Sequence, residues 1–430
     1  MHRFIRDLVL LIAVLGLVGC SANPFSPNRA TPAQQDVRSN QQRATPPETP
    51  PADLGELVQG NSALAFDLYH RLRAEQDNLF YSPYSISLAL AMTYAGARGE
   101  TAEQMAQTLH FSLDPDRLHP AFNALDALLA SRGQDAQGKD GQGFRLHIAN
   151  ALWGQQGYAF RPAFLDLLAE HYGAGLTLLD FRQPEQARQT INQWVAEQTE
   201  DRIQDLLPAG SLNSLTRLVL TNAIYFNAAW EFPFEVEDTT DGAFHLLDGS
   251  EITVPMMRQG EYLYYAQGED YQAVELPYDG GELSMVILLP QPGRFAAFEE
   301  SLDAARVQGI LDEMEQHLVA LTMPRFTIES GMSLADTLSA LGMTTAFKGD
   351  ADFSGMTDTS ELLYIGDVIH KAFVTVDEAG TEAAAATAVV MAGGAPQPQE
   401  MTIDRPFVFV IRDIQTGTLL FVGRVLNPVQ

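Results

Sequence analysis

The chain has 430 residues, with 26 lysines and arginines against 55 aspartates and glutamates, so its formal net charge at pH 7 is −29. Binding to phosphates needs a clustered basic surface, and this acidic balance therefore argues against a nucleic-acid partner. The hydrophobic fraction of 46% indicates a globular chain with an ample core, while the single cysteine excludes an internal disulfide, a cysteine-rich zinc site and an iron–sulfur cluster held within the chain.

Residues 1–19 have the layout of a secretory signal peptide, in which Arg3 and Arg6 precede an apolar run over Leu8–Val18. The run is too short to span a bilayer, which takes about 20 helical residues. It ends in Leu-Val-Gly-Cys, which resembles the lipobox of bacterial lipoproteins. That resemblance implies cleavage before Cys20, lipid on Cys20, and export to the bacterial cell envelope, while Ser21 resembles the outer-membrane sorting pattern. The alternative is an ordinary signal peptide, or a buried helix, with an incidental cysteine.

After Cys20 the composition changes to proline among glutamine, asparagine, serine, threonine and arginine, with scarcely an apolar residue as far as position 52. Such a segment cannot bury enough apolar surface to offset the entropy of ordering it. We therefore expect residues 20–52 to form a disordered tether. Residues 53–430 show no comparable break and are expected to form one domain.

Within this domain, apolar spacing and turn residues predict the elements in chain order. Helices are expected at Asp53–Leu72, Pro83–Ala95 (with an apolar body over Ile86–Ala95), Thr101–Leu109, Pro115–Ser131, Pro162–His171, Pro184–Glu200 and Ser333–Leu341. Strands are expected at Phe144–Gly154, Arg217–Phe226, Gly242–Met257, Glu261–Pro277, Leu283–Leu289, Leu318–Glu329, Leu362–Asp377, Pro406–Asp413 and Thr418–Arg424. Ser82 is expected to cap the second helix, with Pro83 at its first position. The fold class is therefore α+β, with helices first and sheets later.

No nucleophile elbow, Walker loop, dinucleotide fingerprint or metalloprotease helix occurs in the chain, and its nine histidines do not pair at metal-ligand spacing. A catalytic triad could still assemble from distant positions, because triads are defined by geometry. The absence of motifs nevertheless favours a protein that is not an enzyme and that has no catalytic residues, cofactor or metal. Acidic pairs such as Asp377-Glu378 are expected on solvated faces.

The segment Gly380–Gln399 is unusual, because loops of about twenty residues inside compact domains are generally functional or disordered. Its first half consists of small residues apart from one charge. Read as a strand, alternate residues would share one face, namely Thr381, Ala383, Ala385, Thr387 and Val389. The other face would carry Glu382, Ala384, Ala386 and Ala388. The first face could thus be buried without an ionic penalty, which suggests a conformational switch. The alternative is an alanine-rich helix or a slack linker.

Four segments of the sequence resemble the serpin family. Asn78–Leu109 resembles its second and third helices, and Leu218–Phe234 resembles a strand that contains a characteristic asparagine and tryptophan. Asp367–Ala386 resembles the strand that leads into the reactive loop, and Arg405–Pro428 resembles the closing pair of strands. The resemblance extends over the domain from about Leu57 to the end of the chain.

The resemblance to this family implies a single domain with three β-sheets and eight or nine helices, and an exposed reactive loop at about residues 379–400. Most serpins are monomeric suicide inhibitors of serine endopeptidases, with papain-like cysteine endopeptidases as a further class of target. The protease cleaves the loop, the loop inserts into the main sheet as a new strand, and the covalently attached acyl-enzyme is distorted and trapped. The uncut state is held by a kinetic barrier.

The resemblance also implies roles for individual residues. Gly380 matches the hinge glycine and Thr381 matches the first residue to enter the sheet. The hinge continues over Glu382 into the small residues Ala383, Ala384, Ala385 and Ala386, a composition that is typical of inhibitory members. A buried polar cluster beneath the opening of the sheet is matched by Ser82, Ser85, Asn222 and His370. Trp230 matches the tryptophan at the point where insertion begins. Without the family, His370 and Trp230 would be ordinary core residues.

Counting along the loop from Gly380 places the reactive bond at Gly394-Ala395, with Ala395-Pro396 as the neighbouring register. Cleavage at Val390 or Met391 is an alternative that would give a shorter insertion. Small residues at the cut argue against a trypsin-like target and favour an elastase-like or subtilisin-like one. Two further functions stay open: a non-inhibitory serpin that acts as a binding module or protease substrate, and a hydrolase with an unrecognised triad.

Overall fold

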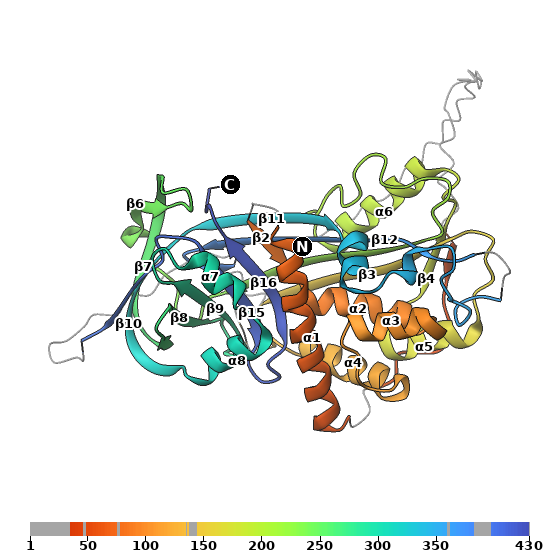
Figure 1. Ribbon diagram of the computed structural model, residues 1–430, viewed down its shortest axis with the longest axis horizontal. Coiled ribbons are helices and arrows are strands. Elements are labelled where there is room, and N and C mark those ends of the chain that lie inside the picture. The colour runs from red at the N-terminus through yellow and green to blue at the C-terminus, as the bar shows by residue number, and fades with distance from the viewer. Residues whose placement is uncertain are drawn as a thin grey trace, which may run out of the picture. The chain divides into compact units, whose positions relative to one another are not determined.

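A computed structural model of the protein describes residues 35–45, 49–74, 78–134, 136, 144–358, 362–381 and 397–429 (Figure 1). Two large sheets cross within these residues, and the helices gather mainly around one of them. The helices are α1 Pro51–Leu72, α2 Pro83–Tyr94, α3 Gly99–Thr108, α4 Pro115–Ala130, α5 Pro162–Tyr172, α6 Pro184–Gln198, α7 Phe295–Glu300, α8 Ala304–Asp312 and α9 Ala335–Leu341. The predicted α+β class is confirmed.

The first sheet has seven strands among the described residues, in the order β1-β4-β3-β5-β13-β12-β11. Their bounds are β1 Gln35–Val37, β4 Leu176–Leu179, β3 Arg145–Gln155, β5 Leu218–Ala229, β13 Gly380–Thr381, β12 Ile365–Asp377 and β11 Phe326–Ser333. Helix α2 packs on one face of this sheet against β3 and β5, and α6 packs on the other face. Both faces are covered, so β5 is buried along its whole length.

The second sheet follows the order β14-β10-β7-β8-β9-β15-β16-β2, with β6 paired to β7. Its bounds are β14 Gln399–Thr402, β10 Glu315–Pro324, β7 Glu251–Gln267, β8 Tyr271–Pro277, β9 Leu283–Pro290, β15 Phe407–Asp413, β16 Leu419–Val425, β2 Leu79–Tyr81 and β6 Thr240–His245. The 17-residue strand β7 joins the part built on β6, β10 and β14 to the part built on β8 and β9. The remaining two of the three expected sheets are therefore one continuous ladder.

Several predicted boundaries differ from the structure. The expected strand at Leu318–Glu329 is two strands, β10 and β11, which belong to different sheets and meet at Arg325. The expected strands at Gly242–Met257 and Glu261–Pro277 are rearranged as β6, β7 and β8. Apolar alternation continues across these bends, so the sequence pattern alone does not reveal where a strand changes sheet.

Helix α2 forms as its sequence predicts. The Oγ atom of Ser82 accepts a hydrogen bond from the backbone N–H of Ser85 at 3.1 Å and thereby caps the helix, with Pro83 at the first position. Every residue from Pro83 to Thr93 is buried, because the helix is enclosed between the seven-stranded sheet and β16. Its N-terminus is consequently fixed directly beneath β5 and β12.

Part of the predicted tether is packed on the domain. Residues 35–37 form β1, which pairs antiparallel with β4 at the edge of the sheet. Further along, the guanidinium of Arg43 contacts the carboxylate of Asp126 at 2.6 Å, and the backbone N–H of Ala44 donates to the carbonyl of Glu170 at 2.9 Å. This corrects the expectation of a disordered segment over 20–52 for its described residues. The polar composition hid the docking because the contacts are mainly hydrogen bonds.

Candidate functional site

A short strand splits the seven-stranded sheet at one end. The residues of β13, Gly380 and Thr381, lie between β5 and β12 and pair antiparallel with both. Below them β5 and β12 pair directly with each other, in parallel, from Tyr225↔Phe373 to Leu218↔Ile365. We call this direct β5–β12 pairing the seam. One end of the seam already admits the start of another strand, while the rest is closed.

The backbone at the start of β13 requires glycine. Gly380 has a φ of 149°, which L side chains rarely adopt. A Cβ atom at this position would lie 2.2 Å from the carbonyl oxygen of Ala228 and 2.7 Å from the Cα atom of Ala229, both on β5. Both the conformation and the close approach to β5 therefore exclude a side chain here.

Thr381 is fully buried and hydrogen-bonds to Tyr278, which in turn stacks on Trp230. Its Oγ1 atom lies 2.9 Å from the hydroxyl of Tyr278, whose ring stacks on that of Trp230 with a centroid distance of 4.7 Å and an interplanar angle of 10°. Burial raises the pKa of Tyr278 well above its usual value, so its hydroxyl stays protonated. Tyr278 is not predictable from the sequence, because an isolated tyrosine after a strand carries no distinctive signal.

Trp230 also holds the chain that leads into β13. Its backbone N–H donates to the carbonyl of Ala379 at 2.9 Å, and its indole Nε1–H donates to the carbonyl of Asp377 at 3.0 Å. The side chain is 2% exposed. The structure thus places Trp230 at the split end of the seam, in contact with the residues that immediately precede the hinge.

Glu378, expected from the sequence on a solvated face, is 5% exposed. The Nε atom of Arg325 donates to its carboxylate at 2.7 Å, and the hydroxyl of Thr239 also donates to it. Burial by itself would raise the pKa of Glu378, but the guanidinium and the hydroxyl outweigh burial and hold the pKa below its usual value. The carboxylate of this ion pair is buried while its guanidinium is partly exposed, and the pair ties Glu378, two residues before Gly380, to the junction between β10 and β11.

A buried polar cluster closes the seam farther down. The structure brings Ser82, Ser85, Asn222 and His370 together, all fully buried. The backbone N–H of Ser82 donates to His370 Nε2 at 3.2 Å, which leaves Nδ1 protonated to donate to Asn222 Oδ1. The amide of Asn222 then donates to Ser85 Oγ and to Asn150 Oδ1. Because Asn222 and His370 are directly paired across the seam, their hydrogen bond is one of the contacts that close it.

This cluster depends on a neutral histidine. Burial lowers the pKa of His370 to about 3, since a buried imidazolium would lose its hydration without gaining a counter-ion. Asn150 on β3 is a further member that is absent from the set predicted from the sequence. Its position opposite Asn222 in the β3–β5 register, and the presence of a polar amide within an apolar strand, are signals that could have identified it.

The other predicted site residues lie outside the described residues. These are Glu382, Ala383, Ala384, Ala385 and Ala386 of the hinge, Gly394 and Ala395 of the reactive bond, and Cys20. In the part of the chain that is described, no helix is both long and apolar enough to cross a membrane.

The fold and the site together define a mixed α and β domain whose main sheet is split at one end by the start of a further strand from its own chain. Residues 59–428 match the family described as Serpin (serine protease inhibitor). The chain therefore belongs to the serpin family.

Relatives match along nearly their whole length. A serpin-like protein of Thermococcus kodakarensis is 41% identical over 98% of this chain and 97% of its own. Leukocyte elastase inhibitor A of Rattus norvegicus is also 41% identical, over 87% of this chain and 100% of its own. Among solved structures, the thermophilic serpin tengpin in its native state has a TM-score of 0.79 at 27% identity, covering 91% of this chain and 97% of its own. Thyroxine-binding globulin in complex with thyroxine has a TM-score of 0.78 at 28% identity, covering 87% and 100%.

Proposed function

We propose that the chain is a suicide-substrate inhibitor of serine endopeptidases, which traps the acyl-enzyme by inserting its cleaved loop along the seam. The observation that carries this proposal is β13, in which Gly380 and Thr381 occupy the strand position between β5 and β12. An inhibitor of this kind consumes itself and turns over no substrate, so it is not an enzyme.

The register of β13 predicts where an inserted loop would lie. Thr381 pairs with Val376 of β12 and with Ala228 of β5, so the paired numbers sum to 381 + 376 = 757 and 381 + 228 = 609. Continued in this register, residue 387 would pair with 757 − 387 = 370 and with 609 − 387 = 222. Thr387 would therefore separate His370 from Asn222 and offer its hydroxyl to both.

The alternation of side chains suits this insertion. Thr381 faces the buried side of the sheet, so positions 383, 385, 387 and 389 would face the same side and carry only alanine, threonine and valine. The only charge in this stretch, Glu382, would face the opposite side, where Thr375 of β12 is only partly buried. Small neutral side chains can enter between the strands without burying a charge.

Insertion would also improve the pairing of the sheet. The seam is one parallel ladder, and parallel pairs are slightly less stable per residue than antiparallel pairs. A strand that continues β13 would replace the seam with two antiparallel ladders. By the same register, residue 757 − 365 = 392 would pair with Ile365, the last residue of the seam. A cut at Gly394-Ala395 would leave this whole ladder available, whereas a cut at Val390 or Met391 would end the strand before Ile365.

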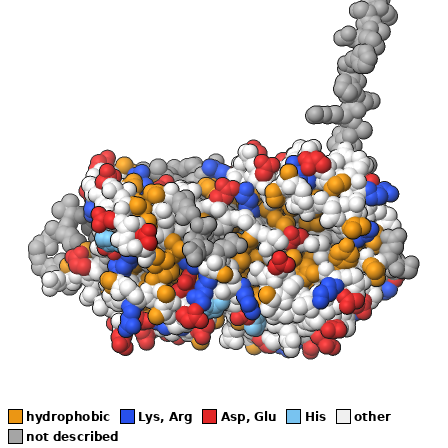
Figure 2. All heavy atoms as spheres, turned by 45° about the horizontal axis from the view of Figure 1, so that its top comes forward, with side chains coloured by type: hydrophobic (Ala, Val, Ile, Leu, Met, Phe, Trp, Pro, Cys, Tyr) orange, Lys and Arg blue, Asp and Glu red, His pale blue; other side chains and the backbone are white. Residues whose placement is uncertain are grey.

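We infer that the target is an elastase-like or subtilisin-like protease, because Met391, Ala392, Gly393 and Gly394 are small or apolar. One relative is named as an inhibitor of leukocyte elastase, which supports this class of target. Acidic side chains are spread over the face in Figure 2 with basic ones among them, so general attraction of a basic protease fits this face better than one acidic docking patch.

We further propose that the protein acts as a monomer held in the bacterial cell envelope by lipid on Cys20. The lipobox-like end of the signal sequence supports this anchor, because several acyl chains on one cysteine would bind a membrane stably. The polar residues that follow Cys20 would leave the reactive loop free to meet a protease outside the cell.

The experiment that tests the inhibitor is incubation of the chain from Ser21 with elastase and with a subtilisin-type protease. A complex that survives denaturing electrophoresis, with a released peptide that begins at Ala395, is the expected result. Clean cleavage of the loop without a complex for both enzymes would contradict inhibition of these classes.

A non-inhibitory serpin is the alternative, and the structural similarity to thyroxine-binding globulin in complex with thyroxine favours it as a second candidate. The two functions predict different melting temperatures for chain whose loop has been cut by a protease but which is not bound to it: an inhibitor that inserts its loop should melt at a higher temperature than the uncut chain. If the melting temperature of the cleaved chain is unchanged, the loop does not insert and the binding-module function is preferred.

A further inference from the structure

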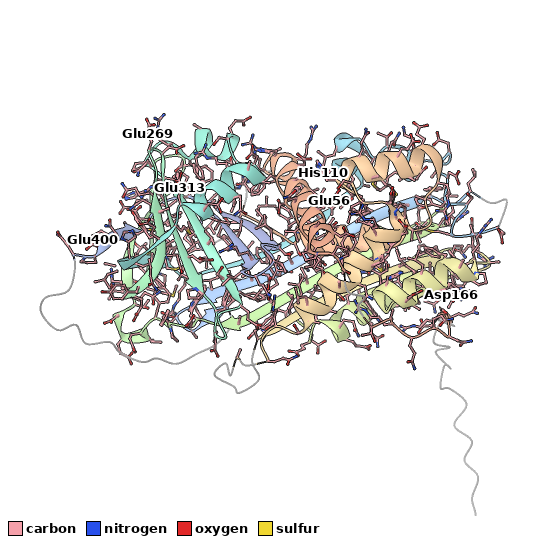
Figure 3. The ribbon with its side chains drawn as sticks, turned by 90° about the horizontal axis from the view of Figure 1, so that it is seen from below. Glu56, His110, Asp166, Glu269, Glu313 and Glu400 are labelled. Carbon is pink, nitrogen blue, oxygen red and sulfur yellow. The ribbon has the colours of Figure 1, made fainter. Side chains whose placement is uncertain are left out.

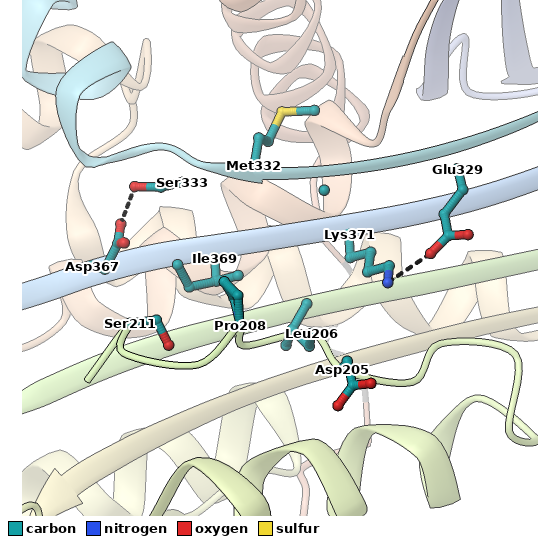
Figure 4. Close-up of a pocket in the computed structure, with 11 residues that line it drawn as sticks. Asp205, Leu206, Pro208, Ser211, Glu329, Met332, Ser333, Asp367, Ile369 and Lys371 are labelled. Carbon is teal, nitrogen blue, oxygen red and sulfur yellow. Dashed lines mark hydrogen bonds and ion pairs between the residues drawn. The ribbon is translucent and has the colours of Figure 1, made fainter. Parts of the chain in front are cut away.

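A cavity of about 430 Å³ lies between two parts of the chain on opposite sides of the seam. One wall is the connection between α6 and β5, which supplies Asp205, Leu206, Pro208 and Ser211 (Figure 4). The other wall consists of residues of β11 and β12. This volume lies within the range of sites for small ligands.

The middle of the cavity is apolar. Leu206 and Pro208 face Ile369 of β12, with Met332 of β11 nearby (Figure 4). Leu206 and Ile369 are 4% and 6% exposed and belong to the hydrophobic cluster under α6. A compact apolar group could contact both walls at once, and the apolar area that it buries would contribute to binding.

The polar rim of the cavity is acidic. Its carboxylates are Asp205, Glu329 and Asp367, and its only cation among the described lining residues is Lys371. The ammonium of Lys371 is already used, since it lies 2.7 Å from Glu329 and donates to the carbonyl of Gln204 at 3.0 Å. Burial raises the pKa of the Asp367 carboxyl, even though the hydroxyl of Ser333 and the backbone N–H of Val368 donate hydrogen bonds to it. A positive charge nearby would therefore favour its ionised form.

One polar atom of the wall is unused. The Oγ atom of Ser211 is enclosed, and no described residue hydrogen-bonds to it. Buried hydroxyls are normally paired, because an unpaired one loses its hydrogen bonds to water without replacement. This hydroxyl can accept a hydrogen bond from a ligand that also presents a positive charge to the carboxylates.

We propose that this cavity binds a small apolar amine, whose body lies between Leu206 and Ile369 and whose ammonium group is received by Ser211 and the acidic rim. The bound amine also holds the seam closed. Admitting one more strand would move β12 and β11 away from β5 by about 4.8 Å, the spacing of neighbouring strands. A ligand that contacts both walls opposes this movement, and this second part rests on the proposed insertion mechanism.

Three probes with one shared body test the binding site: 1-aminoadamantane, 1-adamantanol and 1-adamantanecarboxylate, each titrated into the chain from Ser21 by isothermal calorimetry. The amine is expected to bind, the alcohol to bind about tenfold more weakly for loss of the charge, and the carboxylate not to bind. Equal binding of all three, or binding of none, overturns the proposal.

Two variants locate the probe. Ser211→Ala and Asp205→Asn are each expected to weaken binding of the amine about threefold to tenfold. Asp205 has a side chain that is 84% exposed and that lies 4.0 Å from the guanidinium of Arg188, a contact too long and too exposed to contribute much to stability, so its replacement is expected to leave the fold intact. Asp312→Asn on α8, an exposed carboxylate outside the cavity, is the matched control. Unchanged affinity in both cavity variants, or an equal loss in the control, contradicts binding at this cavity.

The effect on the seam is measured separately, as the number of inhibitor molecules consumed per protease trapped. Saturating amine is expected to raise this number at least twofold by slowing insertion. Binding without any inhibition by the protein would refute the proposed function and leave the site intact. Inhibition without binding would refute the site alone, and binding that leaves the number unchanged would refute its control of the seam.

Discussion

The seven-stranded sheet has two places where a strand could be added, and the chain treats them differently. The edge at β4 is occupied by β1 over Gln35–Val37. It is reinforced by Arg43, which contacts α4, and by Ala44, which hydrogen-bonds to α5. The seam is entered by only two residues of β13 and is closed below by parallel pairing and by the cluster around His370. Figure 3 shows Asp166 of α5, the helix beside the β4 edge, and Glu400 of β14, just after the loop, at opposite ends of the molecule.

The outer edge is thus blocked, while the interior of the sheet is kept available. An open edge strand pairs readily with another chain, and β1 removes that risk at β4. The seam instead requires existing pairs to part before a strand can enter, so its barrier depends on a few residues. The following substitutions test whether the seam and the edge at β4 differ in this way, starting with the seam, where the largest effects are expected.

The largest effect is expected for Thr381→Arg. Thr381 is fully buried in β13, and an unpaired guanidinium in its place would cost several kcal/mol, so this end of the strand would be displaced and the residues after it kept out of the seam. We expect the protein to fold but to be cleaved as a substrate, with the stoichiometry of inhibition rising about tenfold or more. Thr402→Arg, at an exposed position of β14, is the matched control. An unchanged stoichiometry for Thr381→Arg would refute insertion.

Gly380→Ala should weaken the start of insertion. The left-handed backbone costs about 1–3 kcal/mol for a residue with a side chain, and the clash with Ala228 adds to it. We expect trapping to slow at least tenfold, as measured by the rate of complex formation. Gly309→Ala in α8, where nothing lies within 4 Å of the new Cβ atom, should leave this rate unchanged. Equal rates for the two variants would show that the hinge tolerates a side chain.

Acid should open the seam cluster. Below pH 6.5 the unfolded chain binds a proton that folded His370, with a pKa of about 3, does not bind. The contribution of His370 to the free energy of unfolding is therefore fully present above pH 6.5. It falls by about 1.4 kcal/mol per pH unit as the pH is lowered toward 3. His119, whose pKa burial also lowers to about 3, adds a similar slope.

The contribution of His370 can be separated by replacing it with glutamine and measuring urea unfolding between pH 7 and pH 4. His370→Gln should be less stable at pH 7 and should lose the part of the pH slope that His370 contributes, about 1.4 kcal/mol per pH unit. The exposed His245→Gln should keep the full slope. A slope that is the same in His370→Gln and the parent chain would refute the assignment.

The smallest effect is expected at the β4 edge, where residues 35–45 are docked. Arg43→Ala removes a partly exposed ion pair with Asp126 and a 2.8 Å hydrogen bond to Asn123, and should lower the free energy of unfolding by about 1 kcal/mol. Arg38→Ala, elsewhere in the same segment, serves for comparison. Inhibition should be unaffected by either variant, because this edge is remote from the seam. A loss of trapping with Arg43→Ala would show that the two regions are coupled.

Much of the fold follows from local patterns. The cap at Ser82 and the apolar body of α2 are visible in the sequence because they rest on adjacent residues. The division between β10 and β11 at Arg325 is not visible, because both strands carry apolar residues on both sides of the bend. The docking of residues 35–45 is also invisible in the sequence, since it depends on partners more than 75 residues away along the chain.

The site shows the same limit. Family resemblance identifies His370 and Asn222, but Asn150, Tyr278 and the Arg325–Glu378 pair emerge only from three-dimensional contacts. The prediction of a solvated Glu378 is wrong. It rested on the usual exposure of acidic pairs, whereas this carboxylate is buried against the guanidinium of Arg325. Its burial depends on Arg325, which is 53 positions away, and no local pattern records that partner.

The stacking of Trp230 on Tyr278 has a consequence for measurement. The chain has three tryptophans, and of these Trp153 and Trp194 lie against each other by α6, away from the split end of the seam. Of the three, only Trp230 contacts both the backbone that immediately precedes the hinge and, through Tyr278, the side chain of Thr381. Its emission therefore provides a built-in optical signal for the hinge, and a chain that keeps Trp230 while carrying phenylalanine at 153 and 194 would report the time course of loop entry without any attached dye.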